Sequence, residues 1–190
     1  MNSIGEIYLD SAVKRLLTYK QLGEKTLAQL EDQDIHFTPN ETSNSIAVII
    51  RHLHGNMMSR WTNFLTEDGE KEGRNRDTEF NPPAIGKAPL LTLWEEGWDC
   101  LLGTLRTLKD EDLLKIITIR NEPLIVIDAI NRQLAHYPYH VGQIVYIGKL
   151  ILNEKWQSLS IPKGASGEFN QRMKEQHPAM PRDSGSTGSI

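Results

Sequence analysis

The sequence predicts an all-α protein whose four long helices form a four-helix bundle. Apolar residues recur at the helical period of about 3.6 in four separate segments. Two of the three connections between these segments are short and one is long, as is common in bundles. Beyond Asn153 the periodicity stops. We therefore expect a single bundle domain over residues 1–172 and an irregular, flexible C-terminal tail over 173–190.

The four predicted helices are defined by their apolar faces and by the turn-forming residues between them. Gly23 interrupts the first pattern without ending it, and Ser43 or Ser45 is suited to cap the second helix because a serine hydroxyl accepts a backbone N–H. In the fourth segment a persistent apolar face indicates a helix central to the core. The predicted helices span residues 4–31, 45–66, 89–108 and 124–152.

Two connecting segments have a distinctive composition. Residues 66–87 are dense in charge, Gly and Pro, and loops of this length are either functional or simple solvated crossovers. Residues 113–127 are β-branched and are interrupted at Asn121, Glu122 and Pro123. That pattern predicts a short β-hairpin before the fourth helix or, alternatively, an irregular lead-in to it.

Charge and cysteine content exclude several functional classes. The 190-residue chain has a net charge of −4 and lacks a basic cluster, which disfavours nucleic-acid binding. The N-terminus does not resemble a signal peptide, and apolar runs are too short to span a bilayer. The single cysteine, Cys100, lies in a helical pattern, so we expect it to pack as a small buried apolar residue. We expect a cytoplasmic protein that binds neither nucleic acid nor membrane.

Two histidines suggest a metal site. His136 and His140 are four residues apart on the fourth predicted helix, so both imidazoles lie on one helical face and can bind one Zn²⁺, Ni²⁺ or Fe²⁺. Six histidines in 190 residues give roughly 0.2 such pairs by chance, so the spacing alone is weak. Relative to Ile130, the two residues lie at about 240° and about 280° on a helical wheel, where they flank the apolar face.

A third ligand has to come from another helix. The second helix contains His52 and His54, which point in different directions because they are two residues apart. With Ile46 at zero, His54 lies at about 80° and His52 at about 240°, so the wheel mildly favours His54. Both alternatives stay open on this reasoning.

Three motifs in order resemble the DinB/YfiT-like superfamily. These motifs are RHLHGNMMSRWTNFL, DGEKEGRNRDTEF and LAHYPYHVGQIVYIGK. The resemblance covers roughly residues 5–172. Within the superfamily, the motifs are most similar to a bacterial branch with no established function. It implies an up-down-down-up four-helix bundle with one divalent metal on three histidines. Position by position, the family ligand on the second helix corresponds to His52.

The resemblance also indicates where this chain departs from the family. Pro138 lies between the two histidines of the fourth helix, where it removes one backbone hydrogen bond and crowds the carbonyl of Leu134. A kink at the site is one expected consequence. The ligand set implied by the family is His52, His136 and His140.

Further residues are candidates for a substrate pocket around the metal. On the second helix, Asn56 lies one turn and Ser59 two turns beyond His52 on the same stripe, and Arg60, with its long side chain, lies at the margin of that stripe. On the fourth helix, Tyr139 is suited to hydrogen bonding near the site and Gln143 to holding a ligand ring in place. A solvated helix surface or a hydrogen bond between helices is an equally good interpretation of each of the three residues on the second helix.

The resemblance implies several possible functions. Relatives in the wider superfamily include transferases and isomerases that use a low-molecular-weight thiol, so we expect a thiol and a small electrophile as substrates. Hydrolysis by metal-activated water ranks lower because no Asp or Glu adjoins the histidine motifs. The non-enzymatic alternative is a metal-stabilised stress-response or binding module. In each case we expect a homodimer.

Overall fold

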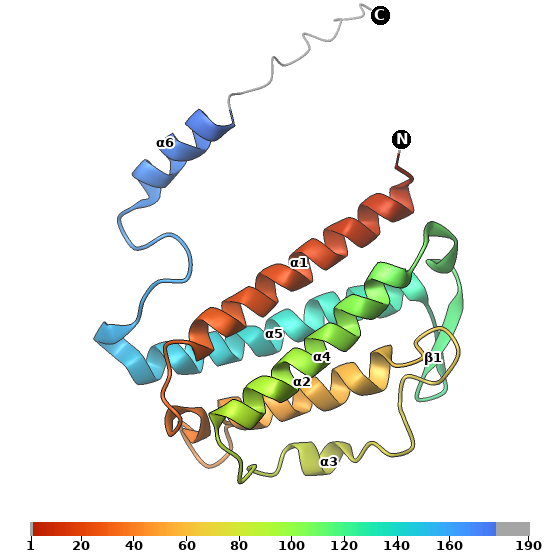
Figure 1. Cartoon of the computed structure of the whole chain (residues 1–190), viewed down its shortest axis with the longest axis horizontal. Helices are drawn as coiled ribbons and strands as arrows, with labels where there is room; N and C mark the ends of the chain where they lie inside the picture. Colours follow the sequence, from red (N-terminus) through yellow and green to blue (C-terminus); the bar gives the residue numbers. More distant parts are fainter. Residues whose placement is uncertain (1, 178–190) are drawn as a thin grey trace, which may run out of the picture. The chain divides into compact units, whose positions relative to one another are not determined.

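The computed structural model describes residues 2–177, which form a mostly helical structure with one small two-stranded sheet (Figure 1). The helical class predicted from the sequence is confirmed. The α-helices are α1 (Ile4–Leu27), α2 (Ile46–Trp61), α3 (Arg76–Glu79), α4 (Lys87–Thr107), α5 (Val126–Leu152) and α6 (Ser166–Gln176). The 3₁₀ helices are η1 (Asp34–His36), η2 (Asp110–Asp112) and η3 (Asn153–Lys155), and the strands are β1 (Ile116–Ile119) and β2 (Glu122–Ile125).

The chain divides into two compact units, one ending at Trp156 and the other beginning at Gln157. The first unit contains α1 to α5 and the hairpin, and the second contains α6. Helix α6 differs from the irregular segment that the sequence predicts after Asn153, and it crosses the boundary expected between residues 172 and 173. Residues 178–190 of the expected tail lie outside the described residues.

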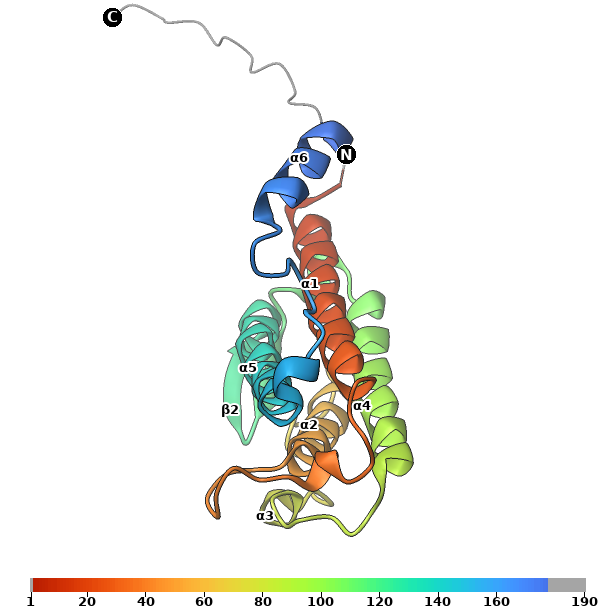
Figure 2. The same cartoon turned by 90° about the vertical axis from the view of Figure 1, so that its left-hand side faces the viewer.

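Four long helices of the first unit enclose its core. Helix α2 packs along α4 and α5, and α1 packs along α5 and α4, so each helix has two neighbours among the others. Figures 1 and 2 show α1, α2, α4 and α5 side by side, with α3 next to α2. The largest side chains at the centre are fully buried, and they include Trp61, Trp94, Trp98 and Tyr137.

Gly23 of α1 has a packing role. A Cβ atom at Gly23 would lie 2.5 Å from the ring of Trp94, too close for any real contact. Gly23 therefore lets the indole of α4 seat directly on α1. This close approach explains why a residue that weakens helices lies inside α1, about one turn before its C-terminal end.

The ends of the helices follow from local hydrogen bonding. Ser3 caps α1 in a capping box with Glu6, and Ser45 caps α2 through the N–H of Val48, which resolves the choice between Ser43 and Ser45. Helix α2 ends at Trp61, earlier than the sequence predicts, because Thr62 is extended and Asn63 has a φ of 50°. The chain therefore leaves the helix before the polar connection begins.

The β-hairpin predicted before the fourth helix is present. Strands β1 and β2 pair antiparallel, with Ile119 opposite Glu122, so Arg120 and Asn121 form the two-residue turn. Both turn residues have positive φ, 55° and 61°, as a type I′ turn requires. Helix α5 begins at Val126 directly after β2.

The hairpin also contributes to the start of α5. The N–H groups of Val126 and Ile127 donate to the carbonyls of Lys115 and Leu113, at 3.0 and 3.1 Å. These bonds satisfy donors that the first turn of a helix leaves without a partner. The start of α5 is therefore fixed by backbone groups at the base of the hairpin.

Within residues 2–177, none of the helices combines the length and the apolar character needed to cross a membrane.

Candidate metal centre

Helix α5 presents four polar side chains along one stripe. Gln133, His136, His140 and Gln143 are separated by three, four and three residues, so they lie above one another on the same helical face. The two imidazoles are partly buried, and their Nε2 atoms are 3.1 Å apart. The i, i+4 spacing therefore produces the paired arrangement that the sequence predicts.

Helix α2 supplies the third histidine. The ring of His52 is buried with 4% exposure, and its Nε2 lies 3.5 Å from Nε2 of His136. His54 does not join this cluster, because its Nε2 pairs with Glu96 of α4 at 3.3 Å. The preference of the helical wheel for His54 is thus not reproduced, since the face with His54 packs against α4 while the face with His52 meets α5.

The nitrogen atoms of the three rings are close enough to bind one ion. Among residues 2–177, His52, His136 and His140 form a group whose ligand atoms all lie within 4.8 Å of one another. A tetrahedral zinc ion with Zn–N bonds of about 2.1 Å separates its ligand nitrogens by about 3.4 Å. The Nε2–Nε2 separations of 3.1 Å (His140 to His136) and 3.5 Å (His52 to His136) lie on either side of that value.

Each histidine is also held through its second nitrogen. Nδ1 of His52 lies 2.9 Å from a carboxylate oxygen of Glu79. Nδ1 of His136 lies 3.2 Å from the side-chain oxygen of Gln133, and Nδ1 of His140 lies 2.9 Å from that of Gln143. All three partners accept hydrogen bonds, so each Nδ1 carries the proton and each Nε2 presents a lone pair.

Three lone pairs directed at one another repel unless a cation lies between them. With every proton on Nδ1, the short Nε2–Nε2 separations are not hydrogen bonds. Neutral imidazole nitrogen is a preferred ligand of zinc, nickel, copper and iron, and a carboxylate or carbonyl partner on the other nitrogen is the usual support of such ligands. The donor set therefore fits a divalent transition metal.

The carboxylate behind His52 is itself fixed by an arginine. The guanidinium of Arg74 donates two hydrogen bonds to Glu79, at 2.7 and 2.9 Å, and the side chain of Arg74 is only 5% exposed. Although burial alone would raise the pKa of Glu79, the hydrogen bonds from His52 and Arg74 lower it below its ordinary value. Glu79 is therefore ionised, and it orients His52 as an acceptor.

Burial keeps the ligand nitrogens free of additional protons. It lowers the pKa of His136 to about 3, and the neighbouring His140 and His52 add to the effect. Burial also lowers the pKa of His140, against the opposing hydrogen bond with Gln143. Both rings are therefore neutral at pH 7, which is the form that binds a metal.

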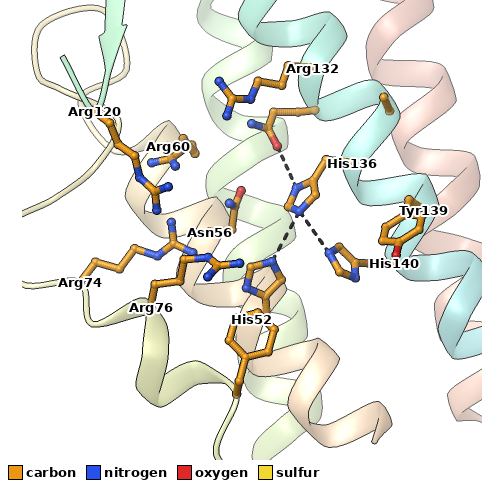
Figure 3. Close-up of a pocket in the computed structure, with 13 residues that line it drawn as sticks. His52, Asn56, Arg60, Arg74, Arg76, Arg120, Arg132, His136, Tyr139 and His140 are labelled. Atoms are coloured by element: carbon orange, nitrogen blue, oxygen red, sulfur yellow. Dashed lines mark hydrogen bonds between the residues drawn. The ribbon is translucent and has the colours of Figure 1, made fainter. Parts of the chain in front are cut away.

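A cleft of about 710 Å³ opens beside the three rings. Figure 3 shows side chains entering it from α2, from the connection that contains α3, from the hairpin and from α5. In the part of the chain that the structure describes, the lining comprises His52, Asn56, Arg60, Arg74, Arg76, Phe80, Arg120, Arg132, Gln133, Ala135, His136, Tyr139 and His140.

Most of the predicted pocket residues lie near this cleft. Asn56, Arg60 and Tyr139 line it, and Tyr139 places its ring 5.0 Å from that of His140. Gln143 lies outside the cleft and holds His140, the supporting role that the sequence suggests. Ser59 does not line this cleft; its buried hydroxyl donates to the carbonyl of Gly69 and accepts from the N–H of Lys71, so it holds the polar connection against α2.

Two neighbours of the ligands have structural roles. Tyr137 is fully buried, as the sequence predicts, and links Trp61 to Asn56 by hydrogen bonds of 2.9 and 3.0 Å. Pro138 lies inside α5, which stays continuous from Val126 to Leu152. The expected disturbance by this proline does not end the helix or separate the two histidines.

Sequence reasoning missed the groups behind the rings. The sequence could have indicated Gln133, because this residue lies three positions before His136 on the same helical face. It could not have indicated Glu79 and Arg74, since they belong to the polar connection and reach His52 only through the tertiary fold. That connection is therefore part of the site and more than a solvated crossover.

These features define a mostly helical protein with a candidate three-histidine metal centre in a cleft lined with arginines. The chain belongs to the family described as "Protein of unknown function (DUF1572)", whose model matches residues 3–165. No curated protein matches the sequence.

Proposed function

We propose that this protein is a divalent-metal-dependent enzyme of the DinB/YfiT-like superfamily that joins a low-molecular-weight thiol to a small electrophile. The observation that carries the proposal is the convergence of the Nε2 atoms of His52, His136 and His140 at the edge of a cleft. The three motifs quoted above and the mutual packing of α1, α2, α4 and α5 support an up-down-down-up four-helix bundle.

Three protein ligands are characteristic of catalytic metal sites. Structural zinc sites are generally closed by four protein ligands, whereas catalytic sites keep one position open for water or substrate. Among residues 2–177, the candidate ligand group consists of His52, His136 and His140, and it borders a cleft. This arrangement favours a catalytic ion over a structural one.

A divalent cation at this site would supply Lewis acidity, which lowers the pKa of a bound thiol. In the proposed reaction the thiol loses its proton to solvent, and its sulfur forms a bond to an electrophilic carbon. With a halogenated aromatic the electron pair of the bond that breaks at that carbon leaves with the halide, with an epoxide it stays on the ring oxygen, and with a maleyl compound the π pair goes to the adjacent carbon; the ring oxygen or that carbon then takes up a proton from solvent. The histidines, held by Glu79, Gln133 and Gln143, fix the position at which the sulfur is presented.

Hydrolysis is less well supported because it requires a general base beside the attacking water. Of the described residues that line the cleft, none is Asp or Glu. Glu79 is close in space, but it contacts Nδ1 of His52, the nitrogen opposite the ligand atom, and it is engaged by Arg74. It is therefore not placed to take a proton from the cleft.

The metal is tested first, by elemental analysis of tag-free protein. We expect about one divalent ion per chain in the wild type, a loss of the metal in His52→Ala and His140→Ala, and full retention in His54→Ala. His54 is the matched control, because it lies on the same helix two residues away and pairs with Glu96. Full metal content in His52→Ala would overturn the ligand assignment.

The reaction is tested with metal-replete protein, a panel of thiols and a panel of electrophiles that includes epoxides, maleyl compounds and halogenated aromatics. We expect turnover that needs both substrates and that stops in His140→Ala. The competing interpretation is a non-catalytic, metal-stabilised module. A large loss of thermal stability on chelation, with neither thiol binding nor turnover, would favour the module and refute the proposal.

A further inference from the structure

The cleft beside the histidines has an unusual charge for this protein. Five of the described residues that line it are arginines, although the chain as a whole has a net charge of −4. Figure 3 shows them around the histidines, and they come from separate segments of the chain. The arginines are Arg60, Arg74, Arg76, Arg120 and Arg132.

The carboxylates around these arginines do not neutralise them. Glu70 alone pairs with Arg60 at 2.9 Å, with Arg74 at 3.4 Å and with Arg120 at 3.1 Å. Glu79 pairs with Arg74 at 2.7 Å, and a third carboxylate, that of Glu122, contacts Arg132 at 3.7 Å. Five guanidinium charges against three carboxylates leave an excess of two positive charges, before any metal is counted.

The two arginines with the weakest internal pairing are Arg76 and Arg132. The guanidinium of Arg76 lies 4.9 Å from the centre of the Phe80 ring, and among residues 2–177 it has no carboxylate partner. Arg132 contacts Glu122 at only 3.7 Å, and the two side chains are 49% and 65% exposed. An ion pair of this kind contributes little, so both guanidinium groups are available to a ligand.

The position of Arg76 is nevertheless fixed. The ring of Phe80 contacts both groups: its centre lies 4.9 Å from that of the His52 ring and 4.9 Å from the guanidinium of Arg76. A cation over an aromatic face is attracted to it, and the long side chain is thereby held near the ligand ring. Arg76 is thus oriented toward the cleft without being neutralised.

A buried amide adds a neutral donor to the same cleft. Asn56 is 7% exposed, and its side-chain oxygen accepts a hydrogen bond from Tyr137 at 3.0 Å. Tyr137 in turn accepts from Trp61, so this chain of hydrogen bonds fixes which end of the amide faces Tyr137. The NH₂ group of Asn56, which lines the cleft, is left to donate to a ligand.

We infer that the cleft binds a small substrate through an oxyanion group, either a carboxylate or a phosphate, with Arg76, Arg132 and Asn56 as the donors. Guanidinium groups match the planar oxygens of a carboxylate and the oxygens of a phosphate, and charge-assisted bonds of this kind are stronger than neutral ones. The inference rests on the proposed function in one respect, namely that the anion is the substrate of the same site.

The test is calorimetric titration at low ionic strength with inorganic phosphate and with succinate, on metal-stripped and on zinc-loaded protein. We expect at least one probe to bind in both forms, with weaker binding as salt is added. The tighter probe identifies the class of oxyanion. Uncharged succinamide is the negative control, and equal binding of succinamide would overturn the inference.

Three variants locate the binding. Arg76→Gln and Arg132→Gln should each weaken the tighter probe by about tenfold, in line with the loss of one charge-assisted hydrogen bond. Arg106→Gln is the matched control, because Arg106 is exposed near the end of α4 and does not line the cleft. Both cleft arginines are exposed, so their replacement leaves the core intact, which circular dichroism verifies.

The two forms of the protein separate this inference from the proposed function. Suppose that the anion binds only to the zinc-loaded protein and that neither arginine variant weakens this binding. The ion alone would then hold the anion, which would refute the inference but leave the metal site intact. Arginine-dependent binding in a protein that takes up no metal would support the anion site and refute the proposed metalloenzyme.

Discussion

The carboxylate of Glu79 accepts a hydrogen bond from Nδ1 of His52 at 2.9 Å, across 27 residues of sequence. Glu79 ends the short helix α3 in the polar connection, whereas His52 lies in the middle of α2. This bond orients the imidazole, places its proton on Nδ1 and leaves Nε2 for the metal. The bond therefore connects the polar segment between α2 and α4, whose role the sequence leaves open, to the centre of the candidate site.

Replacing the carboxylate behind His52 should weaken metal binding. Because supporting groups of this kind are worth roughly 10- to 100-fold in affinity, we expect Glu79→Gln to raise the zinc dissociation constant by that factor. A competition titration with a chromophoric chelator measures it. Asp77→Asn is the control, as Asp77 lies exposed on the same short helix. An unchanged affinity in Glu79→Gln would show that the bond does not support the ligand.

A methyl group at Gly55 should have a similar effect by steric means. Its Cβ would lie 2.2 Å from a carboxylate oxygen of Glu79, so alanine must displace that side chain from His52 and Arg74. We expect weaker zinc binding in Gly55→Ala. In Gly103→Ala the Cβ meets nothing within 4 Å, and this control should be more stable by about 0.5–1 kcal/mol because alanine is the better helix former. Equal zinc affinity in the two variants would contradict the prediction.

The stability of the metal-free protein should decrease on acidification. The pKa of His136 is lowered by burial to about 3 in the folded protein, against about 6.5 in the unfolded chain. Between these values the unfolded chain binds more protons, so the free energy of unfolding falls as the pH drops from about 6.5 toward 3. One such group contributes at most about 1.4 kcal/mol per pH unit.

Urea unfolding of metal-stripped protein at several pH values measures this dependence. His136→Gln should reduce the slope between pH 6.5 and 4, since the group that takes up the proton is gone. His177→Gln should not, because His177 is exposed at the end of α6. If the slope were the same in all three proteins, the neutral state of His136 would not be a source of stability.

Asp68 should stabilise the hairpin that carries Arg120. Its two carboxylate oxygens accept the N–H groups of Arg120 and Asn121, at 2.8 and 2.9 Å, and both residues have positive φ. Hydrogen bonds to the charged form, including one from the N–H of Glu70, lower the pKa of Asp68. Asp68→Ala should therefore cost about 1–3 kcal/mol of stability, as expected when charge-assisted hydrogen bonds are lost.

Hydrogen exchange should localise that loss to the turn. We expect faster exchange at the amides of residues 118–121 in Asp68→Ala, with little change in α1. Asp10→Ala is the control, since Asp10 is exposed on α1. Protection of the turn amides equal to that of the wild type would mean that strand pairing alone holds the hairpin.

The sequence by itself determined the helical class and much of the secondary structure. Apolar periodicity located the long helices, Ser43 or Ser45 was expected to cap α2, and the break at Asn121 to Pro123 predicted a hairpin with an irregular lead-in as the alternative; the structure selects Ser45 and the hairpin. The spacing of His136 and His140 was enough to place both on one face of a helix. These features depend on neighbours within a few residues, where propensity and periodicity act directly.

Only the tertiary structure decided what surrounds the histidines. The wheel favoured His54 because it measures apolarity on one helix, whereas the choice depends on which face of α2 meets α5 and which meets α4. Glu79 and Arg74 reach His52 through long-range packing that no local pattern encodes. The histidine pair is therefore a local property of one helix, but the candidate metal centre and its arginine-lined cleft exist only because distant segments fold against it.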